Sequence, residues 1–96
     1  MPALTKDEVK SRLRNLEGWK PDGDEIEKKF EFADFKASMA FVNRVAARAN
    51  AADHHPDISI KYNRVKLTLS THSEGGVTEK DFALAAEIDA AALPST

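Results

Sequence analysis

The sequence predicts an α+β domain in which helices pack on one face of an antiparallel four-stranded sheet, in the order α-β-β-α-β-β-α. Two patterns in the chain of 96 residues predict this fold class. Apolar residues recur at helical spacing in three segments and alternate with polar residues in the segments between them. Hydrophobic residues make up 42% of the chain and charged residues 31%, which is typical of one globular domain over residues 1–96.

Caps and turn residues mark the first helix and the first hairpin. Thr5-Lys6-Asp7-Glu8 has the spacing of a capping box, so we expect a helix to begin there and to end near Glu17-Gly18. Pro21-Asp22-Gly23-Asp24 predicts a hairpin turn, because proline fixes one dihedral angle and glycine permits positive φ. The following strand, residues 25–32, alternates charged and apolar positions except at Lys28, which predicts one face exposed to water.

A long second helix is expected to begin after Asp34, a suitable N-cap, and to stop by about Asp53. The end follows from Pro56, because the residue before a proline avoids the helical conformation. This helix carries a second apolar stripe beside the first one, formed by Phe41, Val45 and Ala52. We interpret the second stripe as a subunit interface, with a wide core-facing stripe as the alternative. A small domain also gains stability from association, so we expect a homodimer or a homotetramer.

Two alternating segments, residues 58–62 and 65–70, predict the second hairpin. Asn63-Arg64 lies between them and is expected to form a two-residue turn. This register places the apolar residues on one face of the hairpin. It also sets His55 opposite His72, with Cβ atoms roughly 5 Å apart.

The last strand is expected to end at Gly75-Gly76, where two glycines interrupt the alternation. Thr78-Glu79-Lys80-Asp81 then has the spacing of a cap for a third helix. Apolar residues at helical spacing continue this helix to its expected end near Leu93-Pro94.

Composition excludes several classes of function. A formal net charge of -2 with interspersed signs argues against direct binding of nucleic acid. The chain has no cysteine, which excludes disulfides, thiolate nucleophiles and cysteine metal sites. No apolar run reaches the length of a membrane span or a signal peptide, so we expect a cytoplasmic protein without membrane contact.

The histidines are the candidate catalytic residues. All three, His54, His55 and His72, fall in two places that one hairpin can bring together, and histidine transfers protons well near neutral pH. Asp53 is placed either to orient an imidazole or to help end the helix. Asp81 has two interpretations as well, because the helix cap would occupy it while its position after the His72 loop could bring it to the site.

Two alternatives to proton transfer were considered for these residues. A histidine near a helix end can simply interact with the helix dipole. Three histidines can also hold a catalytic zinc, but the chain lacks a His-x-x-x-His pair and cysteine, so we expect no metal. Convergence of three histidines favours acid and base catalysis over both alternatives.

These motifs resemble the pterin-4a-carbinolamine dehydratase family. The resemblance rests on a Gly-Trp segment in the first half, at Gly18-Trp19, and on four motifs in the second half. These are Asp53-His54-His55-Pro56, Tyr62-Asn63, Leu67-Thr68-Leu69-Ser70-Thr71-His72 and Asp81. It implies dehydration of 4a-hydroxytetrahydropterin to quinonoid dihydropterin, which recycles the pterin of aromatic amino acid hydroxylases. Catalysis by the three histidines needs no cofactor, because the pterin is the substrate.

The resemblance also defines a substrate site and two departures from the family pattern. The residues expected to contact the pterin are Asp53, Pro56, Ser70, Thr71, Ser73, Glu74 and Asp81. This chain has Asn50 where many members have an acidic residue, and Ile58 where many have an aromatic one. These departures keep open a non-catalytic alternative, an oligomeric binding or scaffold module on the same fold.

Overall fold

The computed structural model describes residues 3–92, and its elements follow the predicted order. The helices are α1 (Lys6–Leu13), α2 (Phe35–Ala52) and α3 (Glu79–Ala92), and a short 3-10 helix, η1 (His72–Glu74), precedes the last of them. The strands are β1 (Lys20–Asp22), β2 (Glu25–Glu31), β3 (Asp57–Lys61) and β4 (Arg64–Leu69). The predicted end of the third helix near Leu93-Pro94 lies outside the described residues.

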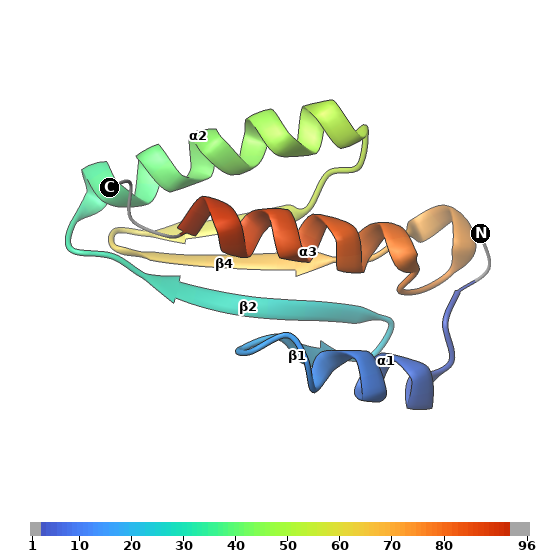
Figure 1. The fold of residues 1–96 in the computed structure, drawn as a ribbon. Coiled ribbons are helices and arrows are strands. Elements are labelled where there is room, and N and C mark those ends of the chain that lie inside the picture. The colour runs from blue at the N-terminus through green and yellow to red at the C-terminus, as the bar shows by residue number, and fades with distance from the viewer. Residues whose placement is uncertain (1–2, 93–96) are drawn as a thin grey trace.

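The strands form one antiparallel sheet in the order β1-β2-β4-β3, with α2 and α3 side by side on one of its faces (Figure 1). The core lies between these two layers, and α1 adds Val9 to it from beside β1. Apolar side chains alternate toward this core because residues two apart on a strand share a face. The fully buried members of the core are Ile26, Phe41, Val45, Leu67, Leu69, Ala85 and Ile88. The predicted α+β fold is confirmed.

The first helix begins as predicted and ends earlier than predicted. Thr5 and Glu8 form the capping box, but the helix stops at Leu13 instead of near Gly18. The amides of Asn15 and Leu16 bond to carbonyls three residues back, so the chain continues in tight turns. These turns bring the Trp19 side chain into the core.

Lys28 interrupts the apolar face of β2 because it has polar partners inside the domain. Its ammonium group donates to Asp89 on α3 at 2.9 Å and to the carbonyl of Glu17 at 2.9 Å. The indole of Trp19 donates to the same carboxylate at 3.1 Å. A buried polar group is tolerated when it is paired in this way.

The second hairpin has a different turn from the predicted one. Tyr62-Asn63 forms the turn in place of Asn63-Arg64, so Lys61 pairs with Arg64. Two hydrogen bonds to Phe32, the residue that follows β2, explain the shift. Phe32 donates its amide to the Asn63 carbonyl at 2.8 Å, and its carbonyl accepts from the Asn63 side chain at 3.1 Å. Tyr62 takes the positive φ, 53°, that we expected of asparagine. The shift is two residues, so each side chain keeps its predicted face.

The second apolar stripe of α2 was assigned to the wrong surface. Phe41 and Val45 are fully buried within this one chain, Phe41 against the rings of Phe30 and Phe32. Only Ala52 of that stripe is exposed. The alternative interpretation, a wide stripe that faces the core, therefore holds for Phe41 and Val45.

Candidate functional site

The end of α2 determines where the two adjacent histidines lie. Asp53 takes a left-handed conformation, with φ 52°, and its amide bonds back to the last turn of the helix. The His54 amide also bonds to the Ala49 carbonyl, at 3.1 Å. A left-handed residue after a helix turns the chain sharply away from the helix axis. His54 and His55 therefore lie at an irregular joint between α2 and β3. Such a joint is needed for both to reach one site, because adjacent residues in a regular helix or strand point in different directions.

His54 contacts a buried carboxylate on α3. Its Nε2 lies 2.5 Å from Oδ1 of Asp81, whose side chain is 0% exposed, while the His54 side chain is 13% exposed. The contact joins the end of α2 to the first turn of α3 across a long separation in sequence. Water is excluded from the carboxylate, so this hydrogen bond is stronger than a similar contact on the surface.

Two threonines hold the second oxygen of Asp81. Oδ2 accepts from the Thr71 hydroxyl at 2.8 Å and from the Thr78 amide at 2.9 Å. The Thr71 hydrogen is used by Asp81, so the Thr78 hydroxyl must donate to Thr71 across their 2.8 Å contact. Thr78 in turn accepts from the Lys80 amide at 3.2 Å. Asp81 therefore only accepts from the two threonines, which is the arrangement a carboxylate requires.

The network determines which nitrogen of His54 carries a proton. A carboxylate that accepts two bonds at Oδ2 also accepts at Oδ1, so Nε2 of His54 is the donor in that contact. The neutral ring then has Nδ1 as its acceptor. His54 is thus oriented for proton transfer through Nδ1. Asp81 serves both as the helix cap and as part of the site.

His55 has a weaker and more exposed partner. Its Nε2 lies 2.9 Å from Oδ1 of Asn50, in the last turn of α2, and both residues are exposed. The amide oxygen can only accept, so this contact also favours a proton on Nε2. Asn50 brings no charge to the ring.

The structure does not place His72 across the hairpin from His55. The strand pairing ends at Asp57 and Thr68, and His72 instead begins the 3-10 helix η1 as an exposed residue. The predicted pairing is therefore wrong, because the turn shifted the register and both histidines lie beyond the ladder. His72 directly follows Thr71, whose hydroxyl donates to Asp81, so it emerges beside the buried network.

The remaining predicted contact residues differ in their surroundings. Asp53 is exposed and serves as the helix C-cap, while Pro56 is partly buried in the following joint. Ser70 donates to the Asp24 carbonyl at 2.9 Å, which ties the end of β4 to the first hairpin. Ser73 and Glu74 are exposed on η1. The structure therefore brings Thr71 and Asp81 together with His54, and places the others around the same loops.

Sequence reasoning missed two residues of this constellation. Thr78 was identified only as a helix cap, although it also bonds to Thr71. Asn50 was recognised only as a departure from the family, although it contacts His55. Its position in the last helical turn was the available signal, because side chains there can reach the residues just beyond the helix end.

A hollow of about 420 Å³ opens beside His54 between α2 and α3. Its polar lining includes Arg48 and Glu87, which form an ion pair at 2.6 Å, and Lys80. Within residues 3–92, no group of three or more His, Cys, Asp or Glu side chains is arranged to hold a metal ion. Over the same residues, no helix is both long and apolar enough to cross a membrane.

The first residue of α3 has an exposed ion pair that contrasts with Asp81. The guanidinium of Arg12 on α1 donates to both carboxylate oxygens of Glu79. This hydrogen bonding lowers the pKa of the Glu79 carboxyl and raises the pKa of Arg12. The start of α3 is thus held by two contacts. Glu79 pairs with Arg12 on the surface, and Asp81 accepts hydrogen bonds in the interior.

Comparison with known proteins assigns the family. The model of the pterin 4 alpha carbinolamine dehydratase family matches residues 2–91. This chain belongs to that family.

Individual relatives cover nearly the whole chain. A protein of Acidobacterium capsulatum named "Putative pterin-4-alpha-carbinolamine dehydratase" is 56% identical, over 94% of this chain and 98% of that protein. A protein of the same name from Sulfolobus acidocaldarius is 50% identical, over 90% of this chain and 94% of that protein.

Two solved structures share the fold. A "transcriptional coactivator/pterin dehydratase" from Brucella melitensis has a TM-score of 0.89 and 43% identity, covering 94% of this chain and 98% of that one. A pterin dehydratase-like protein, described as a RuBisCO assembly factor in the alpha-carboxysome, has a TM-score of 0.65 and 28% identity, covering 80% and 89%. The same fold therefore carries names that point to different functions.

Proposed function

We propose that this protein dehydrates 4a-hydroxytetrahydropterin to quinonoid dihydropterin by histidine acid and base catalysis. The observation that carries the proposal is the contact of His54 with the buried Asp81, which orients one imidazole at the joint that also carries His55. The same Asp81 accepts from Thr71, the residue before His72. Membership of the family supplies the substrate class.

The reaction needs two proton transfers that imidazoles perform well. The bond from C4a to oxygen breaks as the departing hydroxyl gains a proton, and N5 loses its proton as the N5–C4a double bond forms. The two transfers balance, so the enzyme gains no net charge over a turnover. Each well-placed acid or base contributes roughly a hundredfold to ten-thousandfold in rate.

We expect the loop from Ser70 to Glu74 to bind the edge of the pterin ring. A pterin edge alternates donors and acceptors, and an exposed strand end offers main-chain groups of both kinds. Asp53 and Pro56 contribute from the joint after α2. The product would return to an aromatic amino acid hydroxylase, to which this enzyme would be functionally coupled.

The test is a stopped-flow assay of 4a-hydroxytetrahydropterin decay with and without the protein. We expect clear acceleration by the wild type, unchanged after dialysis against EDTA because the proposed chemistry uses no metal. A His54→Gln variant that folds normally should lose most of the acceleration. Decay at the uncatalysed rate in the presence of wild-type protein would overturn the proposal.

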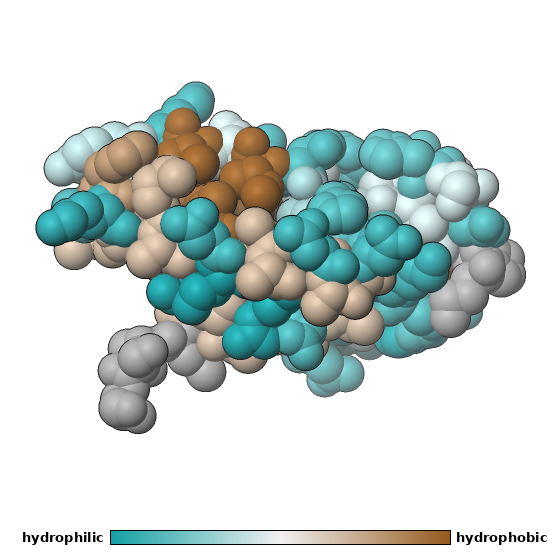
Figure 2. Space-filling view, turned by 90° about the horizontal axis from the view of Figure 1, so that it is seen from above, coloured by the Kyte–Doolittle hydropathy of each residue, from teal (hydrophilic) through white to brown (hydrophobic). Residues whose placement is uncertain are grey.

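We also propose that the protein forms a homodimer or homotetramer, on grounds that differ from the sequence argument. β3 is an edge strand, and Ile58 and Tyr62 at this edge are 39% and 64% exposed. Strongly hydrophobic side chains also gather on the side of the molecule seen from above α2 (Figure 2). Edge strands and apolar patches of this kind favour association. Light scattering at micromolar concentration should exceed the mass of one chain, and the mass of a monomer would refute the proposal.

The second candidate is a non-catalytic binding or scaffold module. The RuBisCO assembly factor with this fold favours it, together with Asn50 and Ile58 in place of the commoner family residues. A pull-down that recovered a stoichiometric protein partner, combined with no dehydratase activity, would support this candidate over the enzyme.

A further inference from the structure

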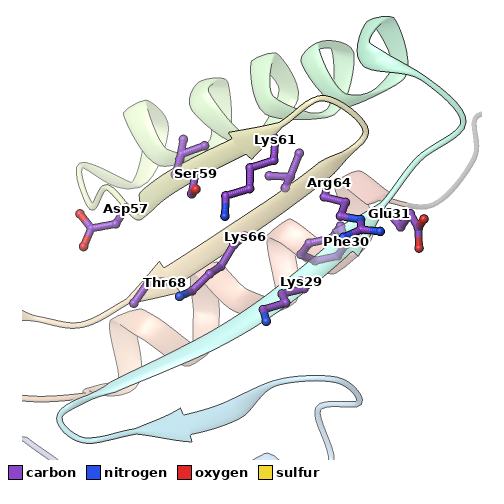
Figure 3. A pocket seen from close by; sticks show the side chains of 11 residues that line it. Lys29, Phe30, Glu31, Asp57, Ser59, Lys61, Arg64, Lys66 and Thr68 are labelled. Carbon is purple, nitrogen blue, oxygen red and sulfur yellow. The ribbon is translucent and has the colours of Figure 1, made fainter.

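The face of the sheet opposite the helices carries a cluster of cations. A hollow of about 630 Å³ lies on this face, and its lining includes Lys29, Lys61, Arg64 and Lys66 (Figure 3). We call these four residues the basic cluster. They come from three neighbouring strands, β2, β3 and β4. None of the histidines lines this hollow.

The strand register sets like charges directly against each other. Lys29 pairs with Lys66 across β2 and β4, and Lys61 pairs with Arg64 across β3 and β4. Like charges directly opposite one another destabilise a sheet. Two such pairs lie side by side on β4, so their repulsion lowers the stability of the folded sheet.

Acidic neighbours offset only part of this charge. Glu31 and Asp57 line the same hollow as the four cations, and Glu31 stands opposite Arg64 in the strand register. Glu27 forms an ion pair with Lys66 at 3.1 Å. Within the part of the chain that the structure describes, Lys29, Lys61 and Arg64 have no ion pair and no side-chain hydrogen bond. The cluster thus offers three free cations to a ligand, beside the Ser59 hydroxyl on the same hollow.

The geometry limits the size of the ligand. Neighbouring strands lie about 4.8 Å apart, and the two like-charge pairs are two residues apart along β4, so the Cα atoms of the cluster fall within roughly 12 Å. Several adjacent negative charges on one small molecule can meet cations at this spacing.

We propose that the basic cluster binds a diphosphate group, either free or as part of a small diphosphate ester. Lys29, Lys61 and Arg64 neutralise the phosphate oxygens, and Ser59 donates a hydrogen bond. Binding removes the repulsion within both like-charge pairs, so the ligand stabilises the folded sheet. The site is separate from the histidines and independent of the dehydratase proposal.

Isothermal titration calorimetry with pyrophosphate and with ADP at low ionic strength tests the site. The two ligands distinguish free diphosphate from a diphosphate ester. Saturable binding of one molecule per chain is expected for at least one ligand, with a rise in melting temperature. The double variant Lys29→Gln, Lys61→Gln should weaken binding by about tenfold or more, because charge-assisted hydrogen bonds are lost. Added salt should weaken the wild-type affinity as well.

A matched control uses two exposed lysines on helices, in the double variant Lys10→Gln, Lys36→Gln. It removes the same charge and should bind pyrophosphate like the wild type, while both double variants keep the wild-type dehydratase rate. If the cluster variant fails to fold, Lys29→Arg, Lys61→Arg should fold and keep the affinity. Absence of saturable binding, or equal weakening by the control, would overturn the proposal. Binding of an acidic peptide or of single-stranded DNA in place of both diphosphates would do so too.

Discussion

His54 and His55 are adjacent in sequence, yet their rings have partners of opposite character. His54 contacts the fully buried carboxylate of Asp81, and His55 contacts the exposed amide of Asn50. Both partners accept a hydrogen bond from Nε2, so both orient an imidazole. Only the partner of His54 is a carboxylate, and only that partner is shielded from water.

The difference shows how one short joint gives two adjacent imidazoles different surroundings. The buried contact depends on α3 and on two threonines, so it is set by the tertiary fold. The exposed contact lies within one helix end and is reached by water. Substitutions at the two partners should therefore differ in size and in kind.

The substitution Asp81→Asn should have the largest effect. The amide can keep its oxygen toward Thr71 and Thr78, but its NH₂ then faces His54 and forces the proton from Nε2 to Nδ1. An Asp-to-Asn change of this kind inverts the tautomer of a catalytic histidine, so the rate should fall by about a hundredfold to ten-thousandfold. Stopped-flow kinetics measure the rate, and circular dichroism measures the fold.

Stability should fall by about 1–3 kcal/mol in the same variant, because hydrogen bonds to a buried carboxylate are stronger than hydrogen bonds to a neutral amide. Thr78→Val provides a control, since it removes one hydroxyl from the network without changing the partner of His54. A wild-type rate in Asp81→Asn would show that the carboxylate partner of His54 does not matter for turnover.

The substitution His72→Ala tests the third histidine, whose place in the site rests on the loop and not on the register. His72 is exposed on η1, so the variant should fold like the wild type. Its turnover should drop by roughly a hundredfold if the ring transfers a proton, and less if it only orients substrate. Lys36→Ala, at an exposed position near the start of α2 and outside the proposed site, is the control. Full activity in His72→Ala would remove this residue from the constellation, and an unfolded variant would show that its role is structural.

The sequence predicted features that depend on neighbouring residues and failed where contacts between distant segments decide the structure. Asp34, Asp53 and the capping box at Thr5 were predictable, because a helix end is set by a few neighbouring residues. The faces of the second hairpin were also predictable from alternation alone. Its register was not, because the bonds between Asn63 and Phe32 link segments far apart in sequence. The buried partners of His54 depend on the same kind of long-range contact.

The substitution Asn50→Asp should give the two histidines similar partners. A carboxylate at this position keeps the hydrogen bond to His55 and favours the protonated ring, so the acid limb of the pH profile should move to higher pH. Solvent exposure keeps the shift to about one pH unit or less. Asn50→Ala is the control, because it loses the bond without adding charge. An unchanged profile in Asn50→Asp, measured as kcat/KM against pH, would mean that His55 does not titrate in the reaction.

The substitution Glu79→Gln should have the smallest effect and extends the comparison to two carboxylates on the same helix start. Arg12 lowers the pKa of the Glu79 carboxyl, so the folded state holds this proton less tightly than the unfolded state. The stability from the pair is therefore fully present above the ordinary pKa range of glutamate and is lost as the pH falls through the lowered folded value. Wild type and variant should differ slightly at neutral pH and converge in acid.

High salt should also remove the difference at Glu79, because both partners of this pair are solvent-exposed and screened. The contact between His54 and Asp81 should resist salt, since its carboxylate is buried. Denaturant melts of the wild type, Glu79→Gln and Asp81→Asn in low and high salt measure both effects. If salt and acid acted equally on the two variants, burial would not be what separates the two carboxylates. The stronger orientation of His54 would then need a cause other than the dry surroundings of Asp81.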